Sequence, residues 1–171
     1  MISKELSATL GFAVREAKKR RHEYVSIEHI LFAILYDPSG IDIIENCGGN
    51  VENLITSLED FFEAKIERIP DGNEYVLQQT IGFQRVIQRA VNHARSAEKP
   101  EVTVSDILAS IFLEKDSHAE YFLSAEGVTR LDVLNFISHN VTKGAYEDEA
   151  GELTRPSKEK TKKKGNPLQL Y

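Results

Sequence analysis

Two histidines with nearby carboxylates are the first residues that could form a metal site or a catalytic site. In the stretch HEYVSIEH, His22 and His29 enclose Glu23 and Glu28. Imidazole nitrogens and carboxylates together can bind zinc or act as general acids and bases. A helical zinc site of the H-E-x-x-H type places its histidines four residues apart on one face, whereas these two are seven apart. A hydrolase or metal enzyme built on His22 and His29 is therefore the weakest functional hypothesis.

Two arginines form a second candidate site, in the stretch FQRVIQRA at residues 83–90. A helix places Arg85 and Arg89 on one face, and it turns Phe83, Val86 and Ala90 inward. Like charges at this spacing repel one another by about 0.2–0.5 kcal/mol. Because the carboxylate of a partner protein would relieve this repulsion, the pattern indicates partner binding.

The other reactive side chains form no catalytic pattern. The single cysteine, Cys47, excludes an internal disulfide framework and is typical of a small buried hydrophobe. The sequence contains no G-x-x-x-x-G-K-[ST] nucleotide loop and no G-x-S-x-G turn. Adjacent carboxylates such as Glu59 and Asp60 fit a solvated helix face better than acid-base catalysis. We predict that this chain is not an enzyme and that it binds no cofactor and no metal.

Composition and charge restrict the class of partner. A length of 171 residues with 41% apolar residues fits one globular domain with a tail. Residues 1–142 carry a net charge of −8 and residues 143–171 carry +2, and an acidic body argues against nucleic acid as a partner. No apolar run approaches the ~18 residues of a membrane span, and the start MISKELSATL does not resemble a signal peptide. We therefore expect a cytoplasmic protein that contacts no membrane.

Helical periodicity and capping residues predict eight helices that would position these side chains. His29 is expected near the start of the second helix and His93 on the fifth, both as partly exposed residues of a polar face. Residues 68–81 contain turn residues and no helical stripe, which predicts an extended joint. The eight predicted segments are about 4–21, 27–36, 38–47, 51–62, 82–97, 104–112, 117–126 and 130–140.

The chain contains an internal repeat. VSIEHILFAIL at residues 25–35 returns as VTVSDILASIF at residues 102–112, which is an offset of 77 residues. We predict an all-α domain at 1–142 that consists of two copies of a four-helix unit, repeat one at 1–67 and repeat two at 80–142, followed by a flexible charged linker at 143–171. The same offset predicts the equivalent pairs Ala13/Ala90, Val14/Val91, Ala17/Ala94, Val51/Val128 and Leu54/Leu131.

The two copies differ where function is expected. Ile30, Leu31 and Ile34 recur as Ile107, Leu108 and Ile111, which is typical of a core shared by both halves. By contrast, Glu28 and His29 correspond to Ser105 and Asp106, while Arg85 and Arg89 correspond to Ala8 and Phe12. The repeated residues thus predict the scaffold, and the differing residues predict a docking face.

Three segments carry a resemblance to a known family. RHEYVSIEHILFAIL, FQRVIQRAV and RLDVLNFISH at residues 130–139 closely resemble the N-terminal domains of ClpA-type AAA+ unfoldases, which feed the ClpP protease. Related ClpB and ClpC domains share the double Clp repeat. The resemblance covers about residues 1–142 and implies an eight-helix domain of two pseudo-twofold repeats, joined flexibly to ATPase rings that this chain lacks. It also implies a monomeric isolated domain within a hexameric parent protein, whose missing modules would bind ATP.

The resemblance further implies a partner and a set of contact residues. Domains of this family dock ClpS-type adaptors, which deliver substrates that bear N-terminal degradation signals, and they also contact some protein substrates themselves. The alternative that remains open is a stand-alone chaperone-like Clp-repeat protein, which would bind unfolded chains in an apolar groove between the repeats. The partner-binding residues that carry over are Glu23, Glu28, Thr80, Arg85, Arg89 and Arg130.

Overall fold

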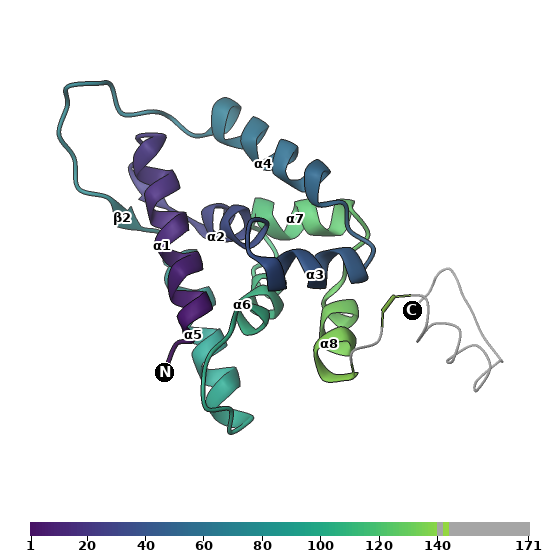
Figure 1. Cartoon of the computed structure of the whole chain (residues 1–171). Helices are drawn as coiled ribbons and strands as arrows, with labels where there is room; N and C mark the ends of the chain where they lie inside the picture. The colour runs from purple at the N-terminus through teal and green to yellow at the C-terminus, as the bar shows by residue number, and fades with distance from the viewer. Residues whose placement is uncertain (140–141, 144–171) are drawn as a thin grey trace.

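Eight helices form the described part of the protein, as the sequence predicts. The computed structural model of the chain describes residues 1–139 and 142–143 (Figure 1). The predicted linker at 143–171 lies outside the described residues apart from Lys143, as does the predicted end of the last helix at Asn140. The elements are α1 Lys4–Lys19, β1 Tyr24–Val25, α2 Ile27–Ile34, α3 Pro38–Asn46, α4 Val51–Lys65, β2 Gln78–Gln79, α5 Ile81–Ser96, α6 Val104–Ile111, α7 His118–Ala125 and α8 Arg130–His139.

Capping residues begin these helices within one residue of the positions that the sequence predicts. The hydroxyl of Ser3 accepts a hydrogen bond from the Leu6 amide at 3.0 Å, and Thr80 does the same for the Phe83 amide at 3.0 Å. The second helix ends at Ile34, two residues before the predicted end at Tyr36. The reason is that Asp37 already caps the next helix, with its carboxylate 3.0 Å from the Gly40 amide.

A short parallel pairing, which the sequence analysis did not predict, links each repeat to the other. In the extended joint, Gln78 and Gln79 pair with Tyr24 and Val25 of the first repeat. An isolated bridge joins Ile2 to Val102, and these residues correspond to Gln79 and Val25 at the offset of 77. Each repeat therefore places the segment before its first helix beside the segment before the second helix of the other repeat.

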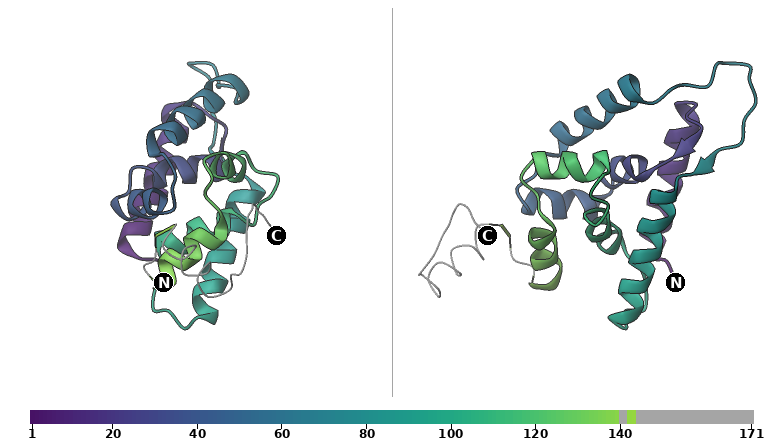
Figure 2. Two further views of the ribbon diagram at one scale, coloured as in Figure 1. Left: turned by 90° about the vertical axis from the view of Figure 1, so that its right-hand side faces the viewer. Right: turned by 180° about the vertical axis from the view of Figure 1, so that it is seen from behind.

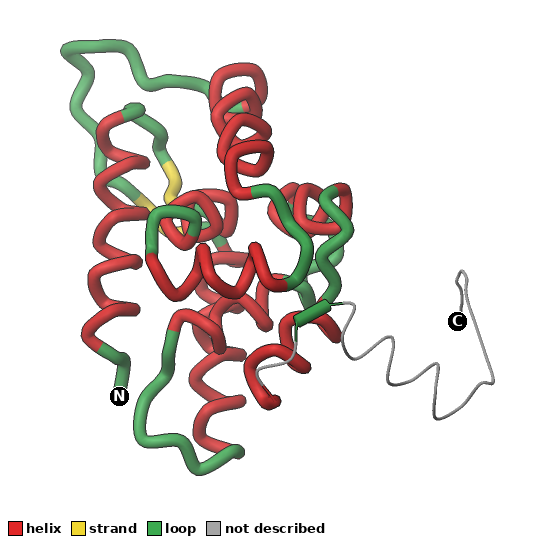
Figure 3. Tube along the Cα trace, turned by 45° about the vertical axis from the view of Figure 1, so that its right-hand side comes forward, coloured by secondary structure: helices red, strands yellow, loops and turns green. Residues whose placement is uncertain are grey.

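The two repeats also interlock through their helices (Figure 2). Within each repeat the first two helices pack together, α1 on α2 and α5 on α6. The third helix of each repeat packs against helices of the other repeat. α3 contacts α6 and α8, and α7 contacts α2 and α4. The predicted core residues of α2 and α6, among them Ile30 and Ile107, are fully buried at the centre of this arrangement. The tube in Figure 3 shows the helices gathered around this centre, with the long joint before β2 outside it.

The offset between equivalent residues changes from 77 to 79 after α6. Gly48 and Gly127, which follow α3 and α7 with φ values of 89° and 80°, are 79 residues apart. Leu54 and Val133 are also 79 apart and fully buried, whereas Leu131 is 60% exposed. The predicted pairs Leu54/Leu131 and Val51/Val128 are therefore wrong. The connection between α6 and α7 is longer than the connection between α2 and α3, and this shifts the register of the later helices.

Candidate functional site

A groove forms where the N-terminal ends of α2, α5 and α7 meet the connection after α6. Its volume is about 330 Å³. We call it the arginine groove and define it by six of the residues that line it. Three of them, Glu28, Thr80 and Arg85, belong to the set of partner-binding residues predicted from the sequence. The six defining residues are Ile27, Glu28, Thr80, Arg85, Glu114 and His118.

Both arginines of the predicted docking face bind one carboxylate of the same chain. Arg85 holds Glu114 through two parallel hydrogen bonds, Nε to Oε2 at 2.7 Å and Nη2 to Oε1 at 2.6 Å, and Arg89 also contacts Oε2 of Glu114. The hydrogen bond from Arg85 holds the pKa of Glu114 below its usual value. The carboxylate that was predicted to come from a partner is thus already supplied by Glu114.

The resulting cluster of two guanidinium groups and one carboxylate still faces solvent. The side chain of Glu114 is 8% exposed, whereas those of Arg85 and Arg89 are 50% and 38% exposed. Bidentate pairing fixes the plane of the Arg85 guanidinium. The three side chains together carry one net positive charge, and the carboxylates of Glu28 and Asp116 line the same groove. The two guanidinium groups therefore offer fixed hydrogen-bond donors that an acidic or polar partner group can contact.

Glu28 has a structural role that the sequence analysis did not identify. Its side chain is buried, and Oε2 accepts a hydrogen bond from the Ala119 amide at 3.0 Å. Ala119 lies in the first turn of α7, where backbone amides have no partner within the helix. A residue of the first repeat therefore caps a helix of the second, and Glu28 ties the two walls of the arginine groove together.

Replacing Glu28 with Ala is expected to lower the free energy of unfolding by about 1–2 kcal/mol, because the Ala119 amide loses its acceptor in a buried place. Urea unfolding followed by circular dichroism measures this. The matched control is Glu23→Ala five residues earlier, where the side chain is exposed and the expected change is within about 0.5 kcal/mol. Equal losses in both variants would contradict the capping role of Glu28.

The remaining predicted residues lie around the groove or apart from it. The carbonyl of Glu23 accepts the Gln78 amide at 2.9 Å, so this residue lies at the β1–β2 pairing with its side chain exposed. Arg130 begins α8, and its Nε donates to the Ala109 carbonyl at 3.2 Å. Neither residue lines the arginine groove. The structure thus groups Glu28, Thr80 and Arg85, brings Arg89 in through Glu114, and leaves Glu23 and Arg130 outside.

Comparison with known proteins identifies the family. The profile of the Clp repeat (R) N-terminal domain matches residues 1–126, which is most of the chain. The chain belongs to the Clp N-terminal domain family. A ClpA homolog protein of Fuscovulum blasticum is 38% identical to this Clp N-domain over 144 residues. The match covers 82% of this chain and 18% of that protein, so the chain spans less than a fifth of this relative.

Solved structures share the fold of this Clp N-domain. The N-terminal domain of Hsp104 from Candida albicans aligns with a TM-score of 0.65 at 12% identity, over 77% of this chain and 85% of that one. The N-domain of ClpV in complex with a VipB peptide aligns with a TM-score of 0.65 at 17% identity, over 81% of this chain and 85% of that one. At such identities the likeness concerns the fold alone.

The histidines of the Clp N-domain differ from their predicted environment. His93 is half-exposed as predicted, but His29 is only 1% exposed and His22 only 3%. The Ser26 amide donates to His29 Nδ1 at 2.9 Å, so the proton of His29 is on Nε2, which lies 2.9 Å from His22 Nδ1. The prediction of a partly exposed His29 is wrong, because the imidazole replaces the usual Glu of a capping box and turns inward against Phe62.

Each histidine of this pair remains neutral at physiological pH. Burial, and then the charge of Arg20, lowers the pKa of His22 to about 4. Burial and the charges of His22 and Arg20 lower the pKa of His29 to about 3. At the equivalent positions of the second repeat, Lys99 and Asp106 form an ion pair with Nζ–Oδ2 at 2.6 Å. A neutral hydrogen-bonded pair in one repeat thus takes the place of a salt bridge in the other.

The reactive groups of the described part of the chain form no metal or thiol site. No group of three or more His, Cys, Asp or Glu side chains in residues 1–139 and 142–143 could hold a metal ion. Burial raises the pKa of the Cys47 thiol to about 11, which fits its predicted place in the core. Within the same residues, the helices are too short or too polar to cross a membrane.

Proposed function

We propose that this Clp N-domain is the non-catalytic recognition domain of an ATP-dependent unfoldase, and that it docks a ClpS-type adaptor. In this proposal the adaptor brings substrates with N-terminal degradation signals, and the parent protein passes them to a ClpP-type protease in the cytoplasm. The family membership and the 38% identity to a ClpA homolog support the proposal that the parent protein is an ATP-dependent unfoldase. The N-domain of ClpV, which has the same fold, is known in complex with a peptide.

The observation that carries the proposal is the cluster of Arg85, Glu114 and Arg89 at the rim of the arginine groove. Charged groups at a rim give an interface its specificity and its rate of association, while apolar contacts supply most of the affinity. An apolar side chain lies next to the groove in the sequence, because Ile81, which follows the lining residue Thr80, is 73% exposed. A fixed guanidinium also loses little conformational entropy when a partner binds.

Calorimetric titration of the full chain with a ClpS-type adaptor tests the proposal. We expect saturable 1:1 binding and a loss of affinity of at least about tenfold, or 1.4 kcal/mol, for Arg85→Glu, which places a repelling charge at the rim. The matched control is Arg95→Glu, the same change at an exposed position almost three turns further along α5. We expect the affinity of this variant for the adaptor to be unchanged. No binding by the intact chain, or equal losses in both variants, would contradict the proposed docking.

A further inference from the structure

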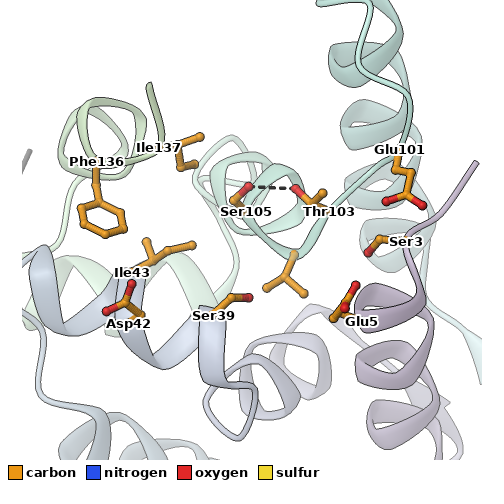
Figure 4. Close-up of a pocket in the computed structure, with 11 residues that line it drawn as sticks. Ser3, Glu5, Ser39, Asp42, Ile43, Glu101, Thr103, Ser105, Phe136 and Ile137 are labelled. Atoms are coloured by element: carbon orange, nitrogen blue, oxygen red, sulfur yellow. Dashed lines mark hydrogen bonds between the residues drawn. The ribbon is translucent and has the colours of Figure 1, made fainter. Parts of the chain in front are cut away.

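A groove between α3, α6 and α8, at the start of α1, has an apolar floor and an acidic rim (Figure 4). Its volume is about 530 Å³. Among the described residues that line it, none is Lys or Arg. The floor is formed by Ile43, Phe136 and Ile137, and Ile137 is 37% exposed. The carboxylates of the rim belong to Glu5, Asp42 and Glu101.

The rim carboxylates are available to a cationic group. All three side chains are exposed, and none forms an ion pair within the described part of the chain. Asp42 accepts one hydrogen bond, from the side-chain amide of Asn46 at 3.0 Å. A lysine side chain can lay its methylene stem on apolar surface while its ammonium group reaches a carboxylate. The groove is therefore complementary to a segment that is rich in lysine.

The chain itself contains such a segment. Residues 155–164, RPSKEKTKKK, have six Lys or Arg and one Glu, which is a net charge of +5, whereas residues 1–142 carry −8. We call residues 155–164 the basic segment. The stretch before it, residues 144–154, has four Asp or Glu and no Lys or Arg, so the acidic rim repels that stretch. The charge of the groove thus favours the basic segment over the rest of the linker.

Lys143 fixes the place from which the linker leaves the domain. Its Nζ lies 2.9 Å from Asp132 Oδ2 in α8, and its amide donates to the Asn46 carbonyl at 2.9 Å. Asp132 is four residues before Phe136 of the groove, which is about 6 Å along the helix axis. The basic segment begins twelve residues after Lys143, and a flexible chain of that length spans about 20 Å on average. The groove is within this reach, at an effective concentration on the order of millimolar.

We propose that the basic segment docks in this groove of its own domain, with lysine ammonium groups at the three rim carboxylates and lysine stems against the apolar floor. Docking folds the linker back on the domain and covers the groove, so any other ligand of the groove has to displace the segment. In the parent protein proposed above, docking would also shorten the tether of the domain. This inference goes beyond adaptor docking and uses no residue of the arginine groove.

Paramagnetic relaxation in methyl NMR spectra of the full chain tests this contact. A nitroxide is attached at Ser157→Cys within the basic segment, because the one native thiol, Cys47, is buried and its pKa is raised by burial to about 11. The reference signal is that of Ile66, which lines a cavity at the opposite end of α1. We expect the relaxation enhancement at Ile137 to be at least about threefold greater than at Ile66, because tethering favours the docked state.

Charge variants identify the groups that make the contact. Lys→Gln changes at 158, 160, 162, 163 and 164 are expected to lower the enhancement at Ile137 at least about threefold, and so is Glu5→Gln combined with Glu101→Gln. The matched control is Glu52→Gln combined with Asp60→Asn, two exposed positions of α4, which should leave the enhancement unchanged. Raising the salt concentration from about 0.05 M to about 0.5 M should lower it as well, because salt screens exposed charges. Circular dichroism confirms that each variant is folded.

Three outcomes would overturn the inference. They are equal enhancement at Ile137 and Ile66, enhancement at Ile137 that persists after the Lys→Gln changes, and equal losses in the α4 control. A mixture of isotope-labelled chain without nitroxide and unlabelled chain with nitroxide should show no enhancement at Ile137. Enhancement in that mixture would place the segment of a second copy in the groove and would also overturn the inference. Arg85→Glu should keep the full enhancement although it weakens adaptor binding, which separates this inference from the adaptor proposal.

Discussion

Lowering the pH from 7 to 5 is expected to remove about 2–4 kcal/mol from the free energy of unfolding through His22 and His29. Their pKa values fall to about 4 and about 3 in the folded protein, against 6.5 as the ordinary value. Below about pH 6.5 the unfolded chain therefore binds protons that the folded protein does not, so stability falls as the pH falls. The loss continues until the pH reaches the folded pKa values near 4 and 3.

Urea unfolding at a series of pH values measures this dependence. The informative variant is His22→Lys combined with His29→Asp, which copies the ion pair of Lys99 and Asp106 from the second repeat. It is expected to flatten the dependence between pH 7 and 5, because an Asp titrates at lower pH than an unfolded His. His93→Gln, which changes an exposed histidine, should leave the wild-type slope in place. A slope that persists after the pair is exchanged would contradict the assignment.

Replacing Gly40 with Ala is expected to lower the free energy of unfolding by about 3 kcal/mol, close to the largest effect of overpacking a core. An added Cβ would lie 2.4 Å from the carbonyl oxygen of Ile34 and 2.5 Å from Ile34 Cγ2. Backbone cannot yield as the end of a flexible side chain can, so α3 must move away from α2. The same movement would disturb Asp42 and Ile43, which line the groove between α3, α6 and α8 (Figure 4).

Gly11→Ala is the matched control, and its expected effect has the opposite sign. Gly11 lies inside α1, and the nearest atom to an added Cβ is the flexible Nη1 of Arg15 at 3.3 Å. Ala is a better helix former than Gly and also restricts the unfolded chain, so we expect a gain of about 0.4–1 kcal/mol. Thermal unfolding of both variants measures these changes in stability. A Gly40→Ala protein as stable as the wild type would contradict the close approach of α2 and α3.

Local signals in the sequence were sufficient to predict the helices. Ser3, Thr80 and Ser117 each begin a helix by accepting a backbone amide, a contact that spans only three residues. The repeated apolar pattern also predicted that Ile30 and Ile107 would be buried in corresponding places. These features depend on neighbours along the chain, and for that reason periodicity and capping residues reveal them.

Contacts between distant residues explain what the sequence did not reveal. Glu114 is 29 residues from Arg85, and Glu28 is 91 residues from the Ala119 amide that it caps. No spacing rule connects such residues, so the arginine pair appeared to need an external carboxylate. The change of offset from 77 to 79 was also hidden, because the similarity between the copies weakens after α6. The burial of Leu54 and Val133 reveals it only in three dimensions.

The central claim is that an adaptor docks at the arginine groove, and methyl NMR of the full chain during titration with a ClpS-type adaptor tests it most directly. We predict that the methyl signals of Ile27 shift in proportion to the adaptor bound, while those of Val104 stay unchanged. The same spectra of the Arg85→Glu variant should show a smaller shift at Ile27 at equal adaptor concentration. Val104 is the equivalent of Ile27 in the second repeat and lines the groove between α3, α6 and α8. Shifts at Val104 with Ile27 unchanged would place the adaptor at that groove and contradict the claim.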